Sequence, residues 1–272
     1  MPVSSSEAAF VRALVYERAA IVLEESKAYL IDSRLEPLAR EGGYPSVDAL
    51  VQAARTGSEA FRLKLVDALT TNETSFFRDL APFDCLRRAL LPALVERRSS
   101  SRKLTFWSAA CSSGQEPYSL AMLIADHFPD LAGWSIRILA SDFSETMLDR
   151  ARLGLFRQLE VNRGLPATSL VKHFTRSGID WKIKPELRQR VEFSRLNLRD
   201  PWCLVSRPDV VFLRNVLIYF DSETKRSVLN RVRESLAPDG LLFLGAAETT
   251  LSLDPKWERL TLGSATLYRP LR

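Results

Sequence analysis

Apolar side chains in the first eighty residues recur every three or four positions, the spacing that gathers them on one face of a helix. One such stripe runs from Val47 to Ala54, directly behind Pro45-Ser46, a pair typical of a helix start. A second stripe runs from Phe61 to Leu69, and two more precede residue 41. The pattern predicts an all-helical N-terminal domain over residues 1–80.

The pattern changes after residue 103, where short apolar runs alternate with helical stretches. Helices are expected at 116–126, 144–153 and 222–236. The runs read as buried strands at residues 104–107, 135–140, 190–194, 209–213 and 241–245, and 266–268 is expected to close the sheet. Strands separated by helices predict an α/β domain, a largely parallel sheet with helices on both faces, over residues 104–272.

Two other segments stand apart from this alternation. Residues 81–103 read as a basic helical linker between the two domains. Two alternating runs meet at Ser177-Gly178 inside the sheet domain, a pattern typical of a β-hairpin. We therefore expect a small inserted antiparallel hairpin subdomain at about residues 165–189.

Composition narrows the class of protein. The chain is 46% hydrophobic and 9% aromatic, which is enough for a buried core. No apolar run approaches the ~18 residues of a membrane span, and the N-terminal residues lack a signal-peptide pattern, so we expect a soluble, cytoplasmic monomer. The three cysteines and two histidines are scattered without a CxxC or a helical His pair. A disulfide framework, a metal site or Cys–His catalysis is therefore not expected.

The net charge of +5 is unevenly distributed. Residues 150–199 carry 12 basic and four acidic side chains, and residues 81–103 carry six and two, whereas residues 1–80 carry nine and 12. Such basic segments suit a polyanionic partner or an acidic protein surface, and they also suit an ordinary solvated face.

Candidate chemistry lies where the predicted strands end. The turn after the first strand, residues 108–116, is rich in small residues that let a ligand approach the backbone, but its single glycine does not fit the GxGxxG of NAD enzymes. Glu116 there could bind a cation or an amino group, or simply favour the helix start. Asp142, after the second strand, could accept ribose hydroxyls or cap the next helix. Together these features favour a nucleoside-containing cofactor.

Four longer motifs make the chain resemble one family. LTTNETSFFRD at residues 69–79, AACSSGQEPYS at 109–119, RNVLIYFD at 214–221, and LAPDG at 236–240 followed by GAAET at 245–249 are similar to the signature of bacterial chemotaxis-receptor methyltransferases. The resemblance spans nearly the whole chain. It implies a Rossmann-like class I methyltransferase domain, the cofactor S-adenosylmethionine with S-adenosylhomocysteine as product, and methylation of receptor glutamates.

The resemblance also implies roles for single residues. Beside these implied roles, our own hypothesis is that Arg78 and Tyr219 are the catalytic pair: Arg78 orients a carboxylate, either the substrate's or the cofactor's, and Tyr219 is the second orienting group near the methyl. The cofactor would be bound by Asn72, Thr74, Arg78, Glu116, Asp142, Asn197, Leu198, Asn215 and Val216. Simpler alternatives remain open: helix caps for Asn72 and Thr74, a surface ion pair for Arg78, a turn for Asn197 and core packing for Tyr219.

The implied partner is the cytoplasmic helical domain of methyl-accepting chemotaxis receptors, with neither nucleic acid nor membrane insertion. The family usually presents a basic helix of its front domain to the receptor, but residues 1–80 are net acidic here, so the basic segment around the hairpin becomes the expected docking surface. The short hairpin turn predicts that no receptor tether is used.

Two other functions were weighed. One is a non-catalytic S-adenosylmethionine-binding signalling module, against which the intact Arg78 and Tyr219 argue. The other is a nucleic-acid methyltransferase, which typically carries Asn/Asp-Pro-Pro-Tyr/Phe after the strand at 209–213, where this chain has Arg214-Asn215-Val216-Leu217.

Overall fold

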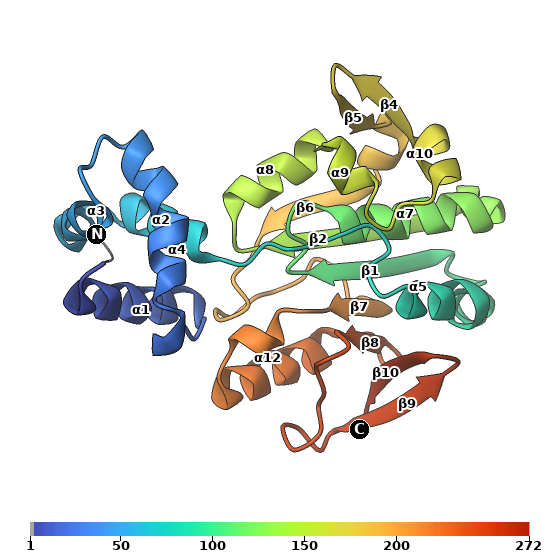
Figure 1. The fold of residues 1–272 in the computed structure, drawn as a ribbon. Coiled ribbons are helices and arrows are strands. Elements are labelled where there is room, and N and C mark those ends of the chain that lie inside the picture. The colour runs from blue at the N-terminus through green and yellow to red at the C-terminus, as the bar shows by residue number, and fades with distance from the viewer. Residues whose placement is uncertain (1–2, 272) are drawn as a thin grey trace.

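The computed structural model describes residues 3–271 and begins with a bundle of helices (Figure 1). Its helices are α1 (Ser5–Ala19), α2 (Tyr29–Glu41), α3 (Val47–Thr56) and α4 (Glu59–Leu69). Side chains of Ser46 and Ser58 accept hydrogen bonds from the backbone N–H groups of Ala49 and Phe61, which satisfies the starts of α3 and α4. The predicted apolar stripes meet in one core, so the all-helical N-terminal domain is confirmed.

A seven-stranded sheet forms the second domain, in the order β6-β2-β1-β7-β8-β10-β9. Its first five strands pair in parallel, and β10 is antiparallel to both of its neighbours. The strands are β1 (Lys103–Ala109), β2 (Ser135–Asp142), β6 (Val191–Arg195), β7 (Val210–Leu213), β8 (Leu241–Leu244), β9 (Trp257–Leu262) and β10 (Ala265–Pro270). Residues 266–268 form part of β10, as predicted, but they do not close the sheet, because β9 forms the edge. Only one side chain of β9 is fully buried, so the strand has no continuous apolar run to reveal it.

Helices cover both faces of this sheet, as expected for the α/β class. On one face pack α7 (Gln115–His127) and α8 (Glu145–Leu153), and on the other packs α12 (Ser222–Ser235). The alternation of β1 explains the two cores, since Phe106 packs with α7 and Trp107 packs with α12.

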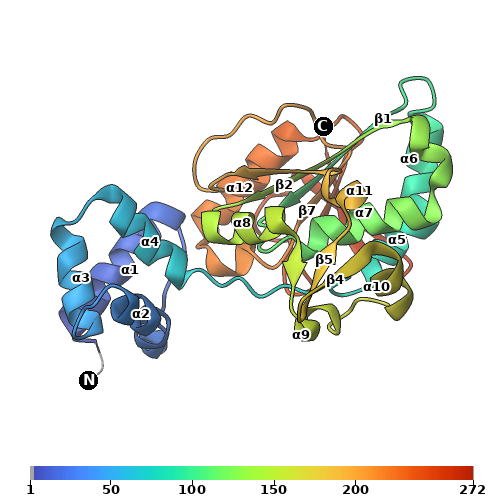
Figure 2. The same ribbon diagram turned by 90° about the horizontal axis from the view of Figure 1, so that it is seen from above.

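The segment 81–103 is helical, with α5 (Ala81–Cys85), a π-helical turn (Leu86–Leu90) and α6 (Leu91–Arg97). Its side chains Leu86, Leu91 and Leu94 are fully buried in the sheet's core, so the segment packs as part of the sheet domain. The extended connection between the domains is instead residues 70–75, which Figure 2 shows leading from α4 toward the sheet.

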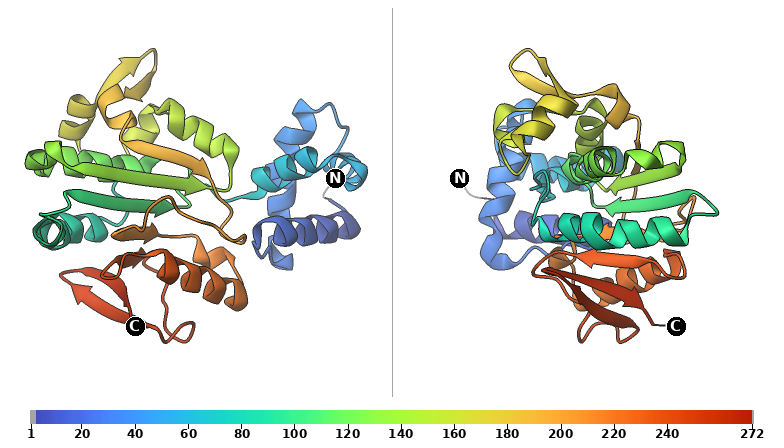
Figure 3. Two further views of the ribbon diagram at one scale, coloured as in Figure 1. Left: turned by 180° about the vertical axis from the view of Figure 1, so that it is seen from behind. Right: turned by 90° about the vertical axis from the view of Figure 1, so that its right-hand side faces the viewer.

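The inserted antiparallel hairpin is present as β4 (Phe174–Ser177) and β5 (Asp180–Ile183). Gly178 opens its two-residue turn at φ 64°, a conformation that glycine adopts without strain. A third strand, β3 (Leu155–Phe156), pairs with β5, so the small sheet begins earlier than residue 165. Short helices α9 (Gln158–Val161), α10 (Ala167–His173) and α11 (Pro185–Arg188) complete this inserted subdomain, which both views of Figure 3 show on the opposite side from β9 and β10.

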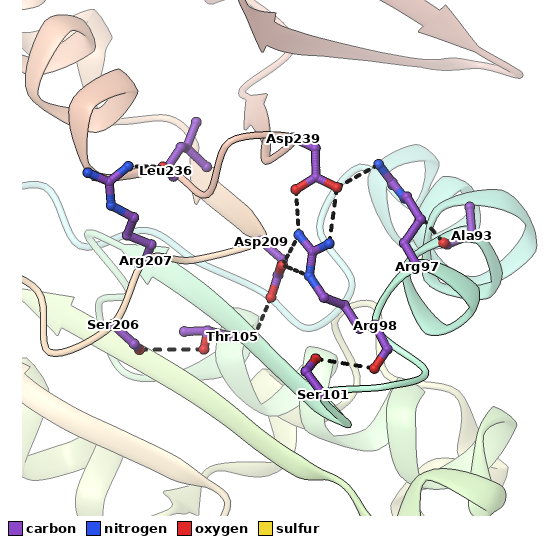
Figure 4. Close-up of polar contacts among 10 residues, drawn as sticks. All are labelled: Ala93, Arg97, Arg98, Ser101, Thr105, Ser206, Arg207, Asp209, Leu236 and Asp239. Carbon is purple, nitrogen blue, oxygen red and sulfur yellow. Dashed lines mark hydrogen bonds and ion pairs between the residues drawn. The ribbon is translucent and has the colours of Figure 1, made fainter.

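A network of ion pairs joins the amino ends of the central strands (Figure 4). Arg98, just after α6, pairs with Asp209 at 2.8 Å and with Asp239. Asp209 also accepts a hydrogen bond from the backbone N–H of Thr105 at 2.9 Å. Asp209 directly precedes β7, Asp239 lies just before β8, and Thr105 is near the start of β1. The network therefore links the amino ends of these strands, opposite to their carboxyl ends.

Over residues 3–271, the helices found are too short or too polar to cross a membrane.

Candidate functional site

The carboxyl ends of β1, β2, β6 and β7 border a partly open cavity, whose other side is lined by residues of the helical domain. Parallel strands end at the same edge of a sheet, and this brings together segments that are far apart in the sequence. All ten predicted site residues line this one cavity: Asn72, Thr74, Arg78, Glu116, Asp142, Asn197, Leu198, Asn215, Val216 and Tyr219. Their individual roles remain predictions.

The turn between β1 and α7 winds tightly along the floor of the cavity. Ala110 and Ser112 have φ values of 58° and 50°, in the left-handed region that residues with side chains rarely adopt. The backbone N–H of Cys111 donates to the carbonyl of Ser141 at 2.9 Å, which fastens the turn to the end of β2. Gly114 also needs to be small, because a Cβ there would lie 3.0 Å from the Cβ of Ala151. The small residues of this motif therefore serve the turn's shape.

Asp142 is buried and already accepts two hydrogen bonds. Its Oδ2 accepts from the N–H of Ser112 at 2.7 Å and its Oδ1 from the N–H of Ser144 at 2.9 Å. Burial raises the pKa of Asp142, and these hydrogen bonds partly oppose that rise. The side chain of Ser144, not Asp142, caps α8 by accepting from the N–H of Met147. Each carboxylate oxygen of Asp142 retains capacity for a further hydroxyl donor.

Glu116 forms part of a buried ion pair that the sequence did not reveal. Its Oε1 accepts from the hydroxyl of Ser108 at 2.7 Å, and its Oε2 lies 2.8 Å from Nη1 of Arg214. Nη2 of Arg214 also pairs with Asp79 at 2.7 Å and donates to the carbonyl of Arg78 at 2.8 Å. The side chain of Arg214 is only 2% exposed, and its Nε has no partner among the described residues.

Arg214 begins the motif at residues 214–221, but the sequence alone predicts no role for it. Its position directly after the buried strand β7 was the available signal, since a charged residue there faces the same edge as Glu116. In the structure it links three segments of the site: the α7 start, the 78–79 loop and the end of β7.

The connection between the domains presents polar groups to the cavity. Arg78 donates to the carbonyl of Glu73 at 2.9 Å, so its hydrogen bond within the protein goes to backbone and not to a carboxylate. Phe76 is fully buried between Phe156 and Phe174, which anchors this segment on the inserted subdomain. Within this motif, the side chain of Phe76 therefore lies in the core, whereas Arg78 lines the cavity.

Asn197 is a turn residue and also a link between the domains. Its Oδ1 accepts from the N–H of Arg199 at 3.1 Å, and its Nδ2 donates to the carbonyl of Arg18 at the end of α1 at 2.8 Å. The turn alternative therefore holds alongside its place in the cavity wall. Leu198 beside it is buried.

Tyr219 ends a 3₁₀ turn (Leu217–Tyr219) and is half-buried. Its carbonyl accepts from the N–H of Val22 at 2.8 Å, and the next residue, Phe220, forms a β-bridge with Ile21. Part of its ring packs on the α12 core, as the alternative of core packing anticipated, while the residue also lines the cavity. These contacts close the helical domain over the site.

The cavity wall combines a few charged and polar side chains with apolar ones, as pockets for small molecules usually do. Within residues 3–271, no three His, Cys, Asp or Glu side chains gather as metal ligands.

Comparison with known proteins gives the same family over both domains. A family model described as "CheR methyltransferase, SAM binding domain" matches residues 72–265, and "CheR methyltransferase, all-alpha domain" matches residues 6–70. A relative named chemotaxis protein methyltransferase 1, from Pseudomonas aeruginosa, is 40% identical over 99% of both chains. Chemotaxis protein methyltransferase Cher2 of Pseudomonas putida is 38% identical over 95% of both chains.

A third relative, a chemotaxis protein methyltransferase of Vibrio parahaemolyticus, is 40% identical over 92% of this chain and 91% of its own. The resemblance drawn from the motifs is thereby confirmed. The chain belongs to the CheR methyltransferase family and has S-adenosylmethionine as its cofactor.

Proposed function

We propose that this protein transfers a methyl group from S-adenosylmethionine to glutamate side-chain carboxylates of chemotaxis receptors, giving glutamate methyl esters. The observation that carries the proposal is the composition of the cavity wall. It combines an acid suited to a ribose, a buried Glu–Arg pair and two orienting groups, Arg78 and Tyr219, in one enclosed space.

The residues present fit the cofactor. Asp142 has acceptor capacity left for the two ribose hydroxyls, and Leu198 and Phe143 offer apolar surface to an adenine ring. At the other end, Glu116 and Asn72 suit the charged methionine part. Bound there, S-adenosylmethionine supplies an activated methyl: its transfer to a carboxylate oxygen forms one C–O bond, breaks one C–S bond and moves no proton.

The cavity favours a carboxylate over an amine or a hydroxyl as the methyl acceptor. A carboxylate with an unperturbed pKa of ~4.3 is already ionised at pH 7 and needs no general base. Among the described residues of the wall there is no His or Lys, and burial raises the pKa of the Cys111 thiol well above its usual range. Glu116 and Asp142 are engaged by Arg214 and by backbone N–H groups, so neither is a free base.

The protein's contribution is then orientation and the exclusion of water. Arg78 would hold the substrate carboxylate with its guanidinium, and the Tyr219 hydroxyl would direct the attacking oxygen. Positioning of this kind contributes ~7–11 kcal/mol to a barrier when two reactants are held in line.

The proposed partner surface is the basic face of the inserted subdomain, where the helical cytoplasmic domain of a receptor would dock. Arg176 and Lys182 are exposed on β4 and β5, whereas Lys172 already pairs with Asp126 at 2.6 Å. We expect the double variant Arg176→Glu/Lys182→Glu to methylate receptors about threefold to tenfold more slowly with an unchanged dissociation constant for S-adenosylhomocysteine. The control is Lys256→Glu, at an exposed lysine outside the inserted subdomain, and it should leave the methylation rate unchanged. If the double variant also methylates at the wild-type rate, these basic residues form an ordinary solvated face and not a docking surface.

The function is tested by incubating the protein with methyl-labelled cofactor and receptor-containing membranes of the organism that encodes it. We expect label on a receptor-sized band that is released as methanol by mild base, since carboxyl methyl esters are base-labile. Base-stable label would indicate another acceptor chemistry. No transfer, with the cofactor bound, would instead support a non-catalytic binding module, a function that no observation in the structure favours.

A further inference from the structure

The GAAET motif, residues 245–249, contains a buried carboxylate with no assigned role. Glu248 lies in the loop after β8 and is 9% exposed. It does not line the cofactor cavity, but it lies against the loop after β7, whose residues Asn215, Val216 and Tyr219 do line it.

The carboxylate of Glu248 accepts hydrogen bonds from four backbone N–H groups in two loops. Its Oε2 accepts from Gly245 at 2.7 Å and from Asn215 at 2.8 Å. Its Oε1 accepts from Val216 at 2.9 Å and from Ile218 at 3.3 Å. Three of these N–H groups belong to the loop after β7 and point to the same side, so they form a concave anion-binding group that Glu248 fills.

This loop needs such support because its backbone is unusual. Asn215 has a φ of 59°, in the left-handed region, and the chain then enters the 3₁₀ turn that ends at Tyr219. A strained backbone persists only where its surroundings fix it. The loop also contacts the helical domain, since the carbonyl of Tyr219 accepts from the N–H of Val22.

We propose that Glu248 is a positioning residue of the cofactor site: its carboxylate holds residues 215–219 in the conformation that presents Asn215, Val216 and Tyr219 to the cavity. The proposal rests on the proposed assignment of those three residues to the cofactor and the methyl group.

The geometry requires a carboxylate and not merely a side chain of that size. Both oxygens face N–H donors, so a glutamine in either amide orientation sets its own NH₂ against two of them. The space is equally restricted at Gly245. A Cβ there would lie 2.7 Å from Oε2 of Glu248 and 2.8 Å from the backbone N of Asn215. Gly245→Ala therefore displaces the same contacts while leaving the charge in place.

The test measures S-adenosylhomocysteine binding by calorimetry on the full chain, well below the unfolding temperature of each variant. We expect Glu248→Gln to raise the dissociation constant by about tenfold or more, because two buried donors lose their acceptor and the loop shifts. Gly245→Ala should change it in the same direction. The matched control is Glu258→Gln. Glu258 lies on β9 and pairs with Arg269 of β10 at the surface, so this change should leave the dissociation constant unchanged.

Several outcomes decide the proposal. A folded Glu248→Gln protein that melts earlier but binds S-adenosylhomocysteine as the wild type does would show a purely structural role and overturn it. If Glu248→Gln does not fold, Gly245→Ala decides, and wild-type binding by that variant overturns it as well. Because the readout is binding and not turnover, a wild type that binds the product but methylates no receptor would contradict the proposed function and leave this inference standing.

Discussion

Both ends of the parallel sheet carry an arginine between two carboxylates, and the cluster at the carboxyl ends lines the cavity described above. At the amino ends, Arg98 joins Asp209 and Asp239, and no buried side-chain atom of that cluster lacks a hydrogen-bond partner within residues 3–271. At the carboxyl ends, Arg214 joins Glu116 and Asp79, and its Nε is left without a partner there.

The backbone differs between the two ends in the same sense. Ala110, Ser112 and Asn215 all take left-handed φ values in the loops at the carboxyl ends, whereas Arg102 is the comparable residue beside the amino ends. Strain and unsatisfied polar groups gather where a protein must present groups to a ligand. We therefore expect the Arg98 end to contribute mainly to stability and the Arg78 and Arg214 end to contribute to the chemistry, and each expectation can be tested.

The largest expected effect is at the carboxyl end. We expect Arg78→Ala to lower the methylation rate about a hundredfold or more, a loss typical of removing one orienting donor. The unfolding temperature should change little, because within residues 3–271 the one hydrogen bond of this guanidinium goes to the carbonyl of Glu73. The measurement is initial rate against receptor membranes beside thermal unfolding. Arg163→Ala, which removes an exposed pair with Glu73, is the control, and equal losses in both variants would deny Arg78 its role.

At the amino ends of the strands we expect the converse: a loss of stability with little change in the methylation rate. Arg98→Met should lower the free energy of unfolding by about 2–4 kcal/mol, since it leaves the buried Asp209 without its cation. The exposed neighbour Arg97, which also pairs with Asp239, is the matched control and should lose only about 0–1 kcal/mol as Arg97→Ala. Urea unfolding measures both. A folded Arg98→Met protein that has lost its methylation rate would erase the distinction between the ends.

At acidic pH, the dependence of cofactor binding on pH should follow the protonation of Asp142. Burial holds its pKa above the ordinary ~3.9 of an aspartate, so its carboxylate gains a proton at a pH where exposed aspartates are still ionised. Protonation of Asp142 at low pH also removes the cost of burying its charge, so the raised pKa by itself does not make the folded protein less stable as the pH falls. We expect the dissociation constant of S-adenosylhomocysteine to rise as the pH falls through this raised pKa. Asp142→Asn should bind weakly with no such dependence, and a wild-type profile that stays flat until exposed aspartates gain their protons would contradict the assignment.

The smallest expected effect concerns Asp239 at the amino ends of the strands, whose pKa is shifted in the direction opposite to that of Asp142. Hydrogen bonds from Arg98 lower the pKa of Asp239, and burial partly opposes this. Its stabilising contribution is therefore complete above the unfolded pKa of ~3.9 and is lost as the pH falls through the lower folded value. Asp239→Asn should flatten the acid loss of unfolding free energy measured by urea titration. An unaltered pH dependence would remove Asp239 from the network's energetics.

The sequence predicted the parts of this molecule that depend on local pattern. Helical periodicity placed α3 and α4, and the rule that parallel strands end at one edge gathered the site residues around one cavity. It missed β3, which is two residues long, and β9, whose alternate positions are exposed at the sheet's edge.

What sequence reasoning could not find were partnerships between distant side chains. Arg214 and Glu116 are 98 residues apart, and Glu248 lies 33 residues from Asn215. Arg214 and Glu248 each read as an ordinary charged residue beside a strand, and nothing near Glu116 or Asn215 in the sequence indicates their partners. Their roles follow only from the register of β1, β7 and β8, which places their loops at the same edge.

One measurement tests the central claim most directly: base-labile methyl label on receptor membranes, compared at equal protein concentration for wild type, Arg78→Ala and Arg98→Met at a temperature where all three are folded. The account predicts methanol-releasing label from the wild type and from Arg98→Met at similar rates, and about a hundredfold less from Arg78→Ala. Base-stable label from the wild type, or equal rates from wild type and Arg78→Ala, would contradict it.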